Sequence, residues 1–146
     1  MAGLDQILED FNRVKAACTD MAQKEILVGL IGGKVDSDVM VIAHAHEYGV
    51  PGKLPERSFI RKGFDTQQEE LSKIVGGALG KMLGEELTPA AAAEAIGAQA
   101  TQLAQSFIDE NQVKPESDFD RKTQHTTLYE TGTHIRDRIA YEVKKK

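Results

Sequence analysis

Two histidines and a glutamate within four consecutive residues, His44, His46 and Glu47, are the side chains of this chain best suited to chemistry. On a β-strand, side chains two residues apart point to the same face, so both imidazoles would be presented together. Neutral imidazole is a good zinc ligand, and His125 or His134 would supply the further ligands that a closed site needs. The segment therefore offers a metal-binding enzyme as one alternative function. The favoured interpretation is structural, with one histidine in the core and the other in solvent.

Established motifs for catalysis are missing from the chain. The zinc-protease pattern places two histidines four apart on a helix with a glutamate between them, and residues 44–47 do not fit it. Residues 28–35 faintly resemble a phosphate-binding loop, but Val28 stands in place of its first glycine and Val35 in place of its hydroxyl residue. No Gly-x-Ser-x-Gly motif is present. We therefore expect no catalytic residue, no metal and no cofactor.

Basic and apolar side chains are mixed over residues 53–62, where Glu56 is the single acid. The basic members are Lys53, Arg57, Arg61 and Lys62, and the apolar ones are Leu54, Pro55, Phe59 and Ile60. The formal net charge of the whole chain is −5, whereas DNA-binding proteins gain affinity by neutralising phosphates. Arginine beside apolar side chains is typical of protein interfaces. The stretch therefore favours a protein contact over nucleic acid.

Charge is divided unevenly along the chain. Residues 121–146 hold seven Lys or Arg and three Asp or Glu, a net charge of +4, which leaves −9 on residues 1–120. A basic end and an acidic body on one subunit suit head-to-tail contact between identical copies. For the three lysines at 144–146, a solubilising basic tail is the favoured interpretation.

Cys18 is the only cysteine, which excludes an internal disulfide and fits a reducing compartment. Because it falls on the apolar stripe of the expected first helix, we predict a buried, unreactive side chain. No stretch is apolar enough over its length to span a bilayer, and the first residues lack the pattern of a signal peptide. We expect the protein to be made in the cytoplasm.

Hydrophobic periodicity divides the first part of the chain into a helix, a strand and an undecided segment. Residues 4–24 carry one apolar stripe with spacings of three and four, which is typical of an amphipathic helix. A short, partly β-branched run over 25–31 ends near two glycines and predicts a strand. Residues 39–46 fit a strand or a helix equally well. Glycines and prolines predict an irregular loop over 49–57.

Two longer helices and a final strand are expected in the second part. Apolar positions recur at helical spacing over 65–83, and a Thr-Pro start signal precedes an Ala-rich helix over 88–111. The polar segment 112–127 is expected to be a loop. The last residues fit either one strand over 135–143 or a helical turn followed by a strand over 139–143.

These elements predict a single α+β domain over residues 1–146, in which a small mixed or antiparallel sheet packs against two to three helices. Residues 1–24 form its N-terminal helical part. The irregular loop over 49–57 is expected to serve as an interface.

Two blocks of residues stand in a fixed order with a long helical region between them. The first block is His46-Glu47-Tyr48-Gly49 followed by Pro55-Glu56-Arg57-Ser58-Phe59-Ile60-Arg61. The second is Leu128-Tyr129-Glu130-Thr131-Gly132 followed by Ile135, Ile139, Tyr141 and Val143. With Val28-Gly29 as an early strand, these blocks resemble the tail-completion, or head–tail joining, family of tailed bacteriophages over about residues 26–143. Ser58 replaces a proline of that pattern, which predicts a less rigid loop.

The resemblance implies a non-enzymatic structural subunit of the neck, the region between capsid and tail, that assembles as a ring around the DNA path. A ring of six copies (a hexamer) is favoured, and a dodecamer is compatible. The implied partners are other copies of the chain and neck or tail proteins such as the connector, terminator or tail tube. Neither sequence-specific nucleic acid nor a membrane is implied. The implied location is the virion neck or tail, after synthesis in the bacterial host cytoplasm.

The residues implied to form the subunit interface, or to position its loop, come from the same blocks. They are His46, Glu47, Tyr48, Gly49, Pro55, Arg57, Phe59, Arg61, Thr131, Gly132 and Tyr141. The 49–61 loop and the basic C-terminal strand are candidates for one side of a ring contact, and the acidic helical faces for the other. A monomeric adaptor module that binds another protein is the second alternative function, and it predicts no self-association at any concentration.

Overall fold

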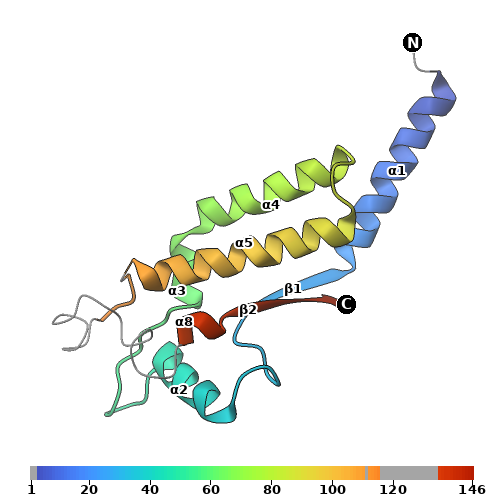
Figure 1. Ribbon diagram of the computed structural model, residues 1–146. Coiled ribbons are helices and arrows are strands. Elements are labelled where there is room, and N and C mark those ends of the chain that lie inside the picture. Colours follow the sequence, from blue (N-terminus) through green and yellow to red (C-terminus); the bar gives the residue numbers. More distant parts are fainter. Residues whose placement is uncertain (1–2, 111, 116–134) are drawn as a thin grey trace.

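The computed structural model describes residues 3–110, 112–115 and 135–146, and these form three layers (Figure 1). One layer is a two-stranded sheet of β1 (Lys24–Gly29) and β2 (Ala140–Lys145). The long helix α5 (Pro89–Asp109) packs on this sheet, and α4 (Gln68–Leu83) packs on α5. This arrangement confirms the predicted α+β class.

The two strands are antiparallel, and they place the segment after α1 beside the C-terminal end of the chain. Ile26 pairs with Val143, and Val28 pairs with Tyr141. The short helix α8 (Ile135–Arg138) precedes β2, so the interpretation as a helical turn followed by a strand is the correct one. Because β2 extends to Lys145, most of the basic end predicted as a tail belongs to the sheet.

Helix α5 begins where its start signal predicted. The Thr88 side chain accepts a hydrogen bond from the Ala91 amide at 3.1 Å, and Pro89 occupies the first helical position. Its buried face consists largely of small residues, which allow neighbouring elements to approach closely. None of the described helices is both long and apolar enough to cross a membrane.

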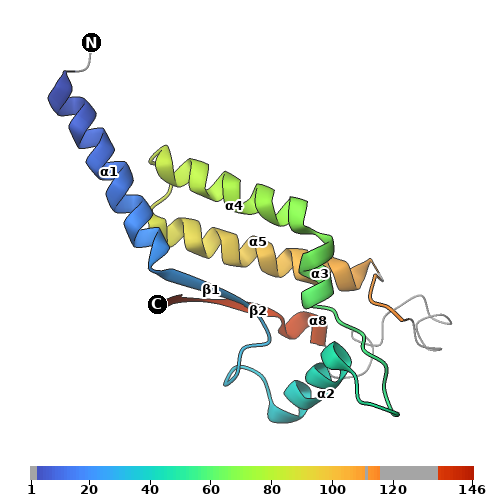
Figure 2. The same cartoon turned by 180° about the vertical axis from the view of Figure 1, so that it is seen from behind.

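Helix α1 (Leu4–Ala22) is present as predicted but has no buried residue. Its C-terminal half packs through Ala17 and Met21 on a cluster from α4 and α5, whereas its N-terminal half projects from the body (Figure 2). The prediction that Cys18 is buried is wrong, because this side chain is exposed. The N-terminal part of the apolar stripe of α1 faces solvent instead of the subunit's own core.

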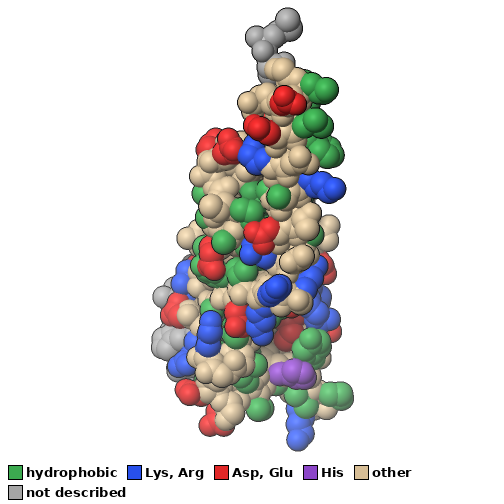
Figure 3. All heavy atoms as spheres, turned by 90° about the vertical axis from the view of Figure 1, so that its right-hand side faces the viewer, with side chains coloured by type: hydrophobic (Ala, Val, Ile, Leu, Met, Phe, Trp, Pro, Cys, Tyr) green, Lys and Arg blue, Asp and Glu red, His purple; other side chains and the backbone are tan. Residues whose placement is uncertain are grey.

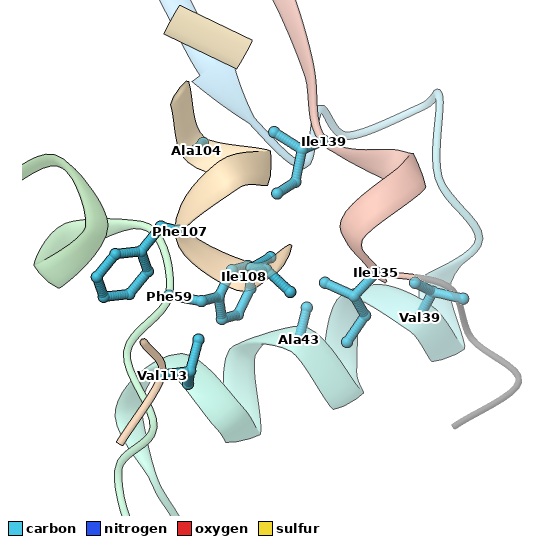
Figure 4. Packing of buried hydrophobic residues seen from close by; sticks show 9 residues of the cluster. All are labelled: Val39, Ala43, Phe59, Ala104, Phe107, Ile108, Val113, Ile135 and Ile139. Carbon is cyan, nitrogen blue, oxygen red and sulfur yellow. The ribbon is translucent and has the colours of Figure 1, made fainter. Parts of the chain in front are cut away.

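The main hydrophobic core lies where α5 meets α2 (Ser37–Tyr48), α8 and the segment before α3 (Arg61–Thr66) (Figure 4). Its buried members are Val39, Ala43, Phe59, Ala104, Phe107, Ile108, Val113, Ile135 and Ile139. The undecided segment 39–46 is therefore a helix that contributes to this core. Val113 belongs to the predicted loop over 112–127, of which only 112–115 is described, and it is fully buried.

The helix predicted from residue 65 starts earlier and is interrupted. Helix α3 begins at Arg61, and the chain bends at Gln67 before α4 begins at Gln68. The Gln67 side-chain amide donates to the carbonyl oxygens of Gly63 and Leu103, each at 3.1 Å. The bend is thereby fixed to α5.

Candidate functional site

The site begins at the end of α2, where Gly49 turns the chain away from the helix. Its φ of 75° lies in the left-handed region, and its amide donates to the Ala45 carbonyl at 2.8 Å. A Cβ at this position would lie 2.8 Å from the backbone nitrogen of Glu56. The close return of the chain and the backbone angle both require glycine here.

The loop after Gly49 folds back onto the end of α2. Val50 and Leu54 exchange two backbone hydrogen bonds, of 2.8 and 2.9 Å. The Arg57 amide then donates to the His46 carbonyl at 2.7 Å. The two halves of the first block, 46–49 and 55–61, are thus brought together in space.

The Glu47 carboxylate holds this arrangement from inside. Its Oε1 accepts hydrogen bonds from Ser58 Oγ at 2.7 Å, from the Arg61 amide at 3.1 Å and from Arg61 Nε at 2.9 Å. Its Oε2 accepts from the amides of Phe59 at 2.9 Å and Ile60 at 3.0 Å. The Phe59 and Ile60 amides lie immediately before α3, at the end of the helix where a negative charge is favoured. With five donors on a residue that is 7% exposed, the carboxylate is an internal anchor for the loop.

Burial alone would raise the pKa of Glu47, but the hydrogen bonds to its ionised form outweigh that effect and lower the pKa. The bonds responsible come from Ile60, Ser58, Arg61 and Phe59. A general base needs a free lone pair within reach of a substrate proton. The Glu47 oxygens are occupied by the protein's own donors, so their role is to position the loop.

An aromatic and cationic group lies on the outside of the anchor. The Arg61 guanidinium lies 4.5 Å above the centre of the Tyr48 ring, and the His44 ring lies 4.6 Å from the same ring. Arg61 Nη2 donates to the Glu47 carbonyl at 2.8 Å and to Glu56 Oε1 at 3.1 Å. Tyr48 is 53% exposed, so the anchor presents a fixed aromatic and arginine pair to solvent. Such side chains are enriched at protein interfaces.

Two further predicted residues tie the loop to the body. Phe59 is 1% exposed and belongs to the main core (Figure 4). Arg57 is also buried, and its Nε donates to the Pro115 carbonyl at 2.7 Å. Pro55, by contrast, lies exposed on the loop.

A groove of about 300 Å³ lies next to this anchor. Helix α2, the end of β1 and the residues leading into α3 line it. Most of its lining is apolar, through residues such as Leu30, Met40 and Ala43. Its polar and aromatic members are His44, Glu47, Tyr48 and Arg61. The groove is therefore an apolar recess beside the exposed aromatic and arginine pair.

The second block is only partly within the described residues. Thr131 and Gly132 lie outside them. Tyr141 lies in β2, away from the anchor, where its ring packs against Gly97 of α5. A hydrogen bond to the ionisable Glu94 side chain, followed by burial, raises the pKa of the Tyr141 hydroxyl. Tyr141 therefore connects the sheet to α5.

The geometry on which the metal-site alternative rested is not present. His44 and His46 lie on helix α2, where residues two apart are about 200° apart around the axis. Over the part of the chain that the structure describes, no three or more His, Cys, Asp or Glu side chains group as metal ligands. His125 and His134 lie outside that part.

Two contributors were missed by reasoning from the sequence. Ser58, expected to loosen the loop, donates to Glu47 and accepts from the Lys62 amide at 3.2 Å, neither of which a proline could do. Arg136 makes two hydrogen bonds to Asp109, of 2.8 and 2.9 Å, that tie α8 to α5. Ser58 is not the N-cap residue of α3, and the contacts of Ser58 with Glu47 and of Arg136 with Asp109 depend on tertiary folding, so no local signal in the sequence marks them.

Comparison of the chain with protein-family models, with curated proteins and with solved structures finds no match.

Proposed function

We propose that this chain is a non-enzymatic structural subunit of the head–tail neck of a tailed bacteriophage or prophage, working in a ring of identical copies. The observation that carries the proposal is the Glu47 anchor. It joins both halves of the first block that resembles the tail-completion family, and it uses the block's only buried carboxylate for that purpose.

The anchor suits a protein whose task is to present a fixed loop. A loop whose backbone amides are fixed before contact loses less conformational entropy when it docks, which favours association. On its outer side the anchor displays Tyr48 and Arg61, the residue types that dominate binding energy in protein interfaces. The loop is therefore well suited to a subunit contact.

In a ring, each subunit must carry two different, complementary patches, because the contact is head-to-tail. The anchored loop supplies one patch and an acidic helical face the other. Six copies are favoured and twelve are compatible. Neck or tail proteins such as the connector, terminator or tail tube would meet the two open faces of the ring. The net charge of −5 suits a wall that lets DNA pass without retaining it.

The first test is light scattering on size-exclusion fractions from micromolar to millimolar protein, with negative-stain microscopy and a metal assay on the same fractions. We expect a closed, metal-free ring of about six times the 16.0 kDa subunit mass. A strict monomer at every concentration would favour the adaptor alternative. Stoichiometric zinc in the fractions would favour the metal-binding alternative.

The second test addresses the location directly. Antibody against the chain, labelled with gold, should bind at the junction of capsid and tail on virions of the phage or prophage that encodes it. Virions with attached tails that contain none of the chain would contradict a role in the finished neck.

A further inference from the structure

Helix α1 exposes an apolar stripe that the subunit itself leaves uncovered. Leu4, Ile7, Leu8 and Phe11 recur at spacings of three and four, and they are 71%, 56%, 50% and 63% exposed. In Figure 3, hydrophobic side chains gather along one edge of the projecting end of the molecule. Four large apolar side chains on one face of a helix form the pattern by which a helix docks into an apolar groove.

The N-terminal half of α1 has little support from its own subunit. Among the described residues, the hydrogen bonds and ion pairs from α1 to the body that lie nearest the tip come from Arg13, which donates to the Leu83 carbonyl at 3.3 Å and pairs with Glu85 at 3.0 Å. Residues 4–12 extend beyond that point (Figures 1 and 2). Most helical stability in proteins comes from packing of an amphipathic face, so this unpacked half of α1 gains stability from a partner.

An apolar recess of matching kind lies at the other end of the subunit. It is the groove beside α2, of about 300 Å³, and its lining includes Tyr48, which is 53% exposed. Helix α2 also exposes Val41 (69%) and Ile42 (37%), which are not part of that lining. Figure 3 shows hydrophobic side chains together with a histidine at this opposite end. The two uncovered apolar surfaces thus belong to the two ends of one elongated molecule.

The stripe end is acidic, whereas the groove end carries exposed basic side chains. The stripe is flanked by Asp5, Glu9 and Asp10, and the helix has no basic residue before Arg13. Arg61 on the wall of the groove and Lys62 beside it begin α3, and both have exposed side chains, although they pair with Glu47 or Glu56. Residues 28–62 hold five Lys or Arg and four Asp or Glu, a net charge of +1, against −3 for residues 4–12. This difference in charge favours contact between the two unlike surfaces over pairing of two acidic stripes.

We propose that the N-terminal half of α1 from one copy of this chain docks in the α2 groove of a second copy. The two surfaces lie at opposite ends, so one subunit cannot satisfy both by itself (Figures 1 and 2). The contact is head-to-tail, and repetition of it closes a ring when the rotation allows. This inference rests on the proposed ring assembly and names the two surfaces that make it.

Disulfide trapping tests the contact, because Cys18 is the only native cysteine. In a Cys18→Ser background, Ile7→Cys, Leu8→Cys or Phe11→Cys is prepared as one set, and His44→Cys, on the groove wall, as the other. Each variant of the first set is mixed with a size-tagged His44→Cys chain, oxidised and run on a non-reducing gel. We expect a cross-link between tagged and untagged chains for at least one α1 position, and none from Cys18→Ser alone.

The double variant Leu8→Cys with His44→Cys extends this test. Head-to-tail docking predicts a ladder of cross-linked species that stops at the copy number of the ring. Cross-linking of Leu8→Cys with itself, without His44→Cys, would show that α1 pairs with α1 and would overturn the proposal. A ring seen by light scattering without any α1-to-groove cross-link would overturn the docking and leave the ring standing. A strict monomer would overturn both.

A matched pair of charge variants supplies a second readout. Phe11→Asp places a charge in the stripe, and Asn12→Asp places the same charge on the same helix outside it. Both side chains are exposed, so neither change should impair folding of the subunit. We expect Phe11→Asp to raise the concentration needed for assembly by tenfold or more, on the order of the loss of an interface hot spot, and Asn12→Asp to leave it nearly unchanged. Equal effects of the two variants would overturn the proposal.

Discussion

The aromatic ring of Tyr141 lies directly against the backbone of Gly97. A Cβ built at residue 97 would be 2.3 Å from Cδ2 and 2.7 Å from Cγ of that ring. These ring atoms lie close to the Tyr141 backbone, so β2 itself would have to move to make room. The absence of a side chain at one position of α5 therefore sets how closely the sheet packs on the central helix.

Gly97→Ala should lower the free energy of unfolding, because the added methyl group overpacks the contact with Tyr141. The overpacking cost exceeds the gain in helix propensity, and we expect a net loss of about 2 kcal/mol in urea denaturation. Gly76→Ala on α4 is the matched control, since nothing lies within 4 Å of its Cβ position. That change should stabilise the protein by about 0.5–1 kcal/mol. Equal effects at the two positions would contradict the packing argument.

Glu47→Gln should destabilise the protein through the loop. The side-chain NH2 group of glutamine is a hydrogen-bond donor, and it would face backbone amides and a hydroxyl that are themselves donors. At least one of the amides and hydroxyls around it then loses its acceptor in a buried site, at a cost of about 3 kcal/mol. Glu56→Gln removes an exposed acid that also contacts Arg61, and it should cost less than about 1 kcal/mol. Urea denaturation of both variants measures the difference. Similar losses would mean that Glu47 acts only through its ion pair with Arg61.

The stability that Glu47 contributes should depend on pH. Its pKa is lowered in the folded protein, so the contribution is complete above the ordinary value of 4.5 and is lost as the pH falls through the folded pKa. The difference in unfolding free energy between wild type and Glu47→Gln should therefore narrow below pH 4.5. Denaturation curves for both proteins from pH 7 to pH 3 check this. A constant difference across the range would show that the pKa of Glu47 is the same in the folded and unfolded states, and it would contradict the lowered pKa.

Local signals in the sequence were sufficient to predict the helices that have a start signal or a regular apolar stripe. Thr88 and Pro89 mark the start of α5, and the apolar stripe marks α1. Residues 39–46 could not be assigned because a short apolar run suits either kind of element, and only packing around Val39 and Ala43 makes it helical. The burial of Cys18 was mispredicted for a related reason. An apolar stripe shows that a face needs a partner but does not say that the partner belongs to the same chain.

The candidate site was predicted in part. Its first block named Glu47, Gly49, Arg57 and Arg61, and the structure brings these residues together. The sequence does not reveal that one carboxylate receives five hydrogen bonds, since the donors become neighbours only after the loop has closed. Ser58 acquires its role in the same way. Of the second block, Ile135 and Ile139 pack in the same core as Phe59, whereas Tyr141 connects the sheet to α5. Thr131 and Gly132 lie outside the described residues.

Asp109→Asn should loosen α8 from α5, because it removes one partner of a two-point contact with Arg136. The pair is partly exposed, so we expect a loss of only about 0.5–1 kcal/mol at low salt. Glu69→Gln, which breaks the exposed pair with Lys73 on α4, should cost less. Thermal unfolding in 50 mM and 1 M sodium chloride separates the cases, since salt should reduce the Asp109 effect by screening. If the stability lost in Asp109→Asn is the same in high salt, the contact stabilises the protein through packing and not through charge.

Zinc should leave the thermal stability of the protein unchanged. On helix α2, His44 is exposed and His46 is half-buried on a different side of the axis, so the two imidazoles do not converge. A metal bound to the folded state at 100 times its dissociation constant would add about 2.7 kcal/mol and raise the melting temperature. We expect no rise with equimolar or tenfold zinc, and no fall with a chelator, in differential scanning calorimetry. A saturable rise at one equivalent that His44→Ala and His46→Ala both abolish would restore the metal-binding alternative, and it would require α2 to rearrange.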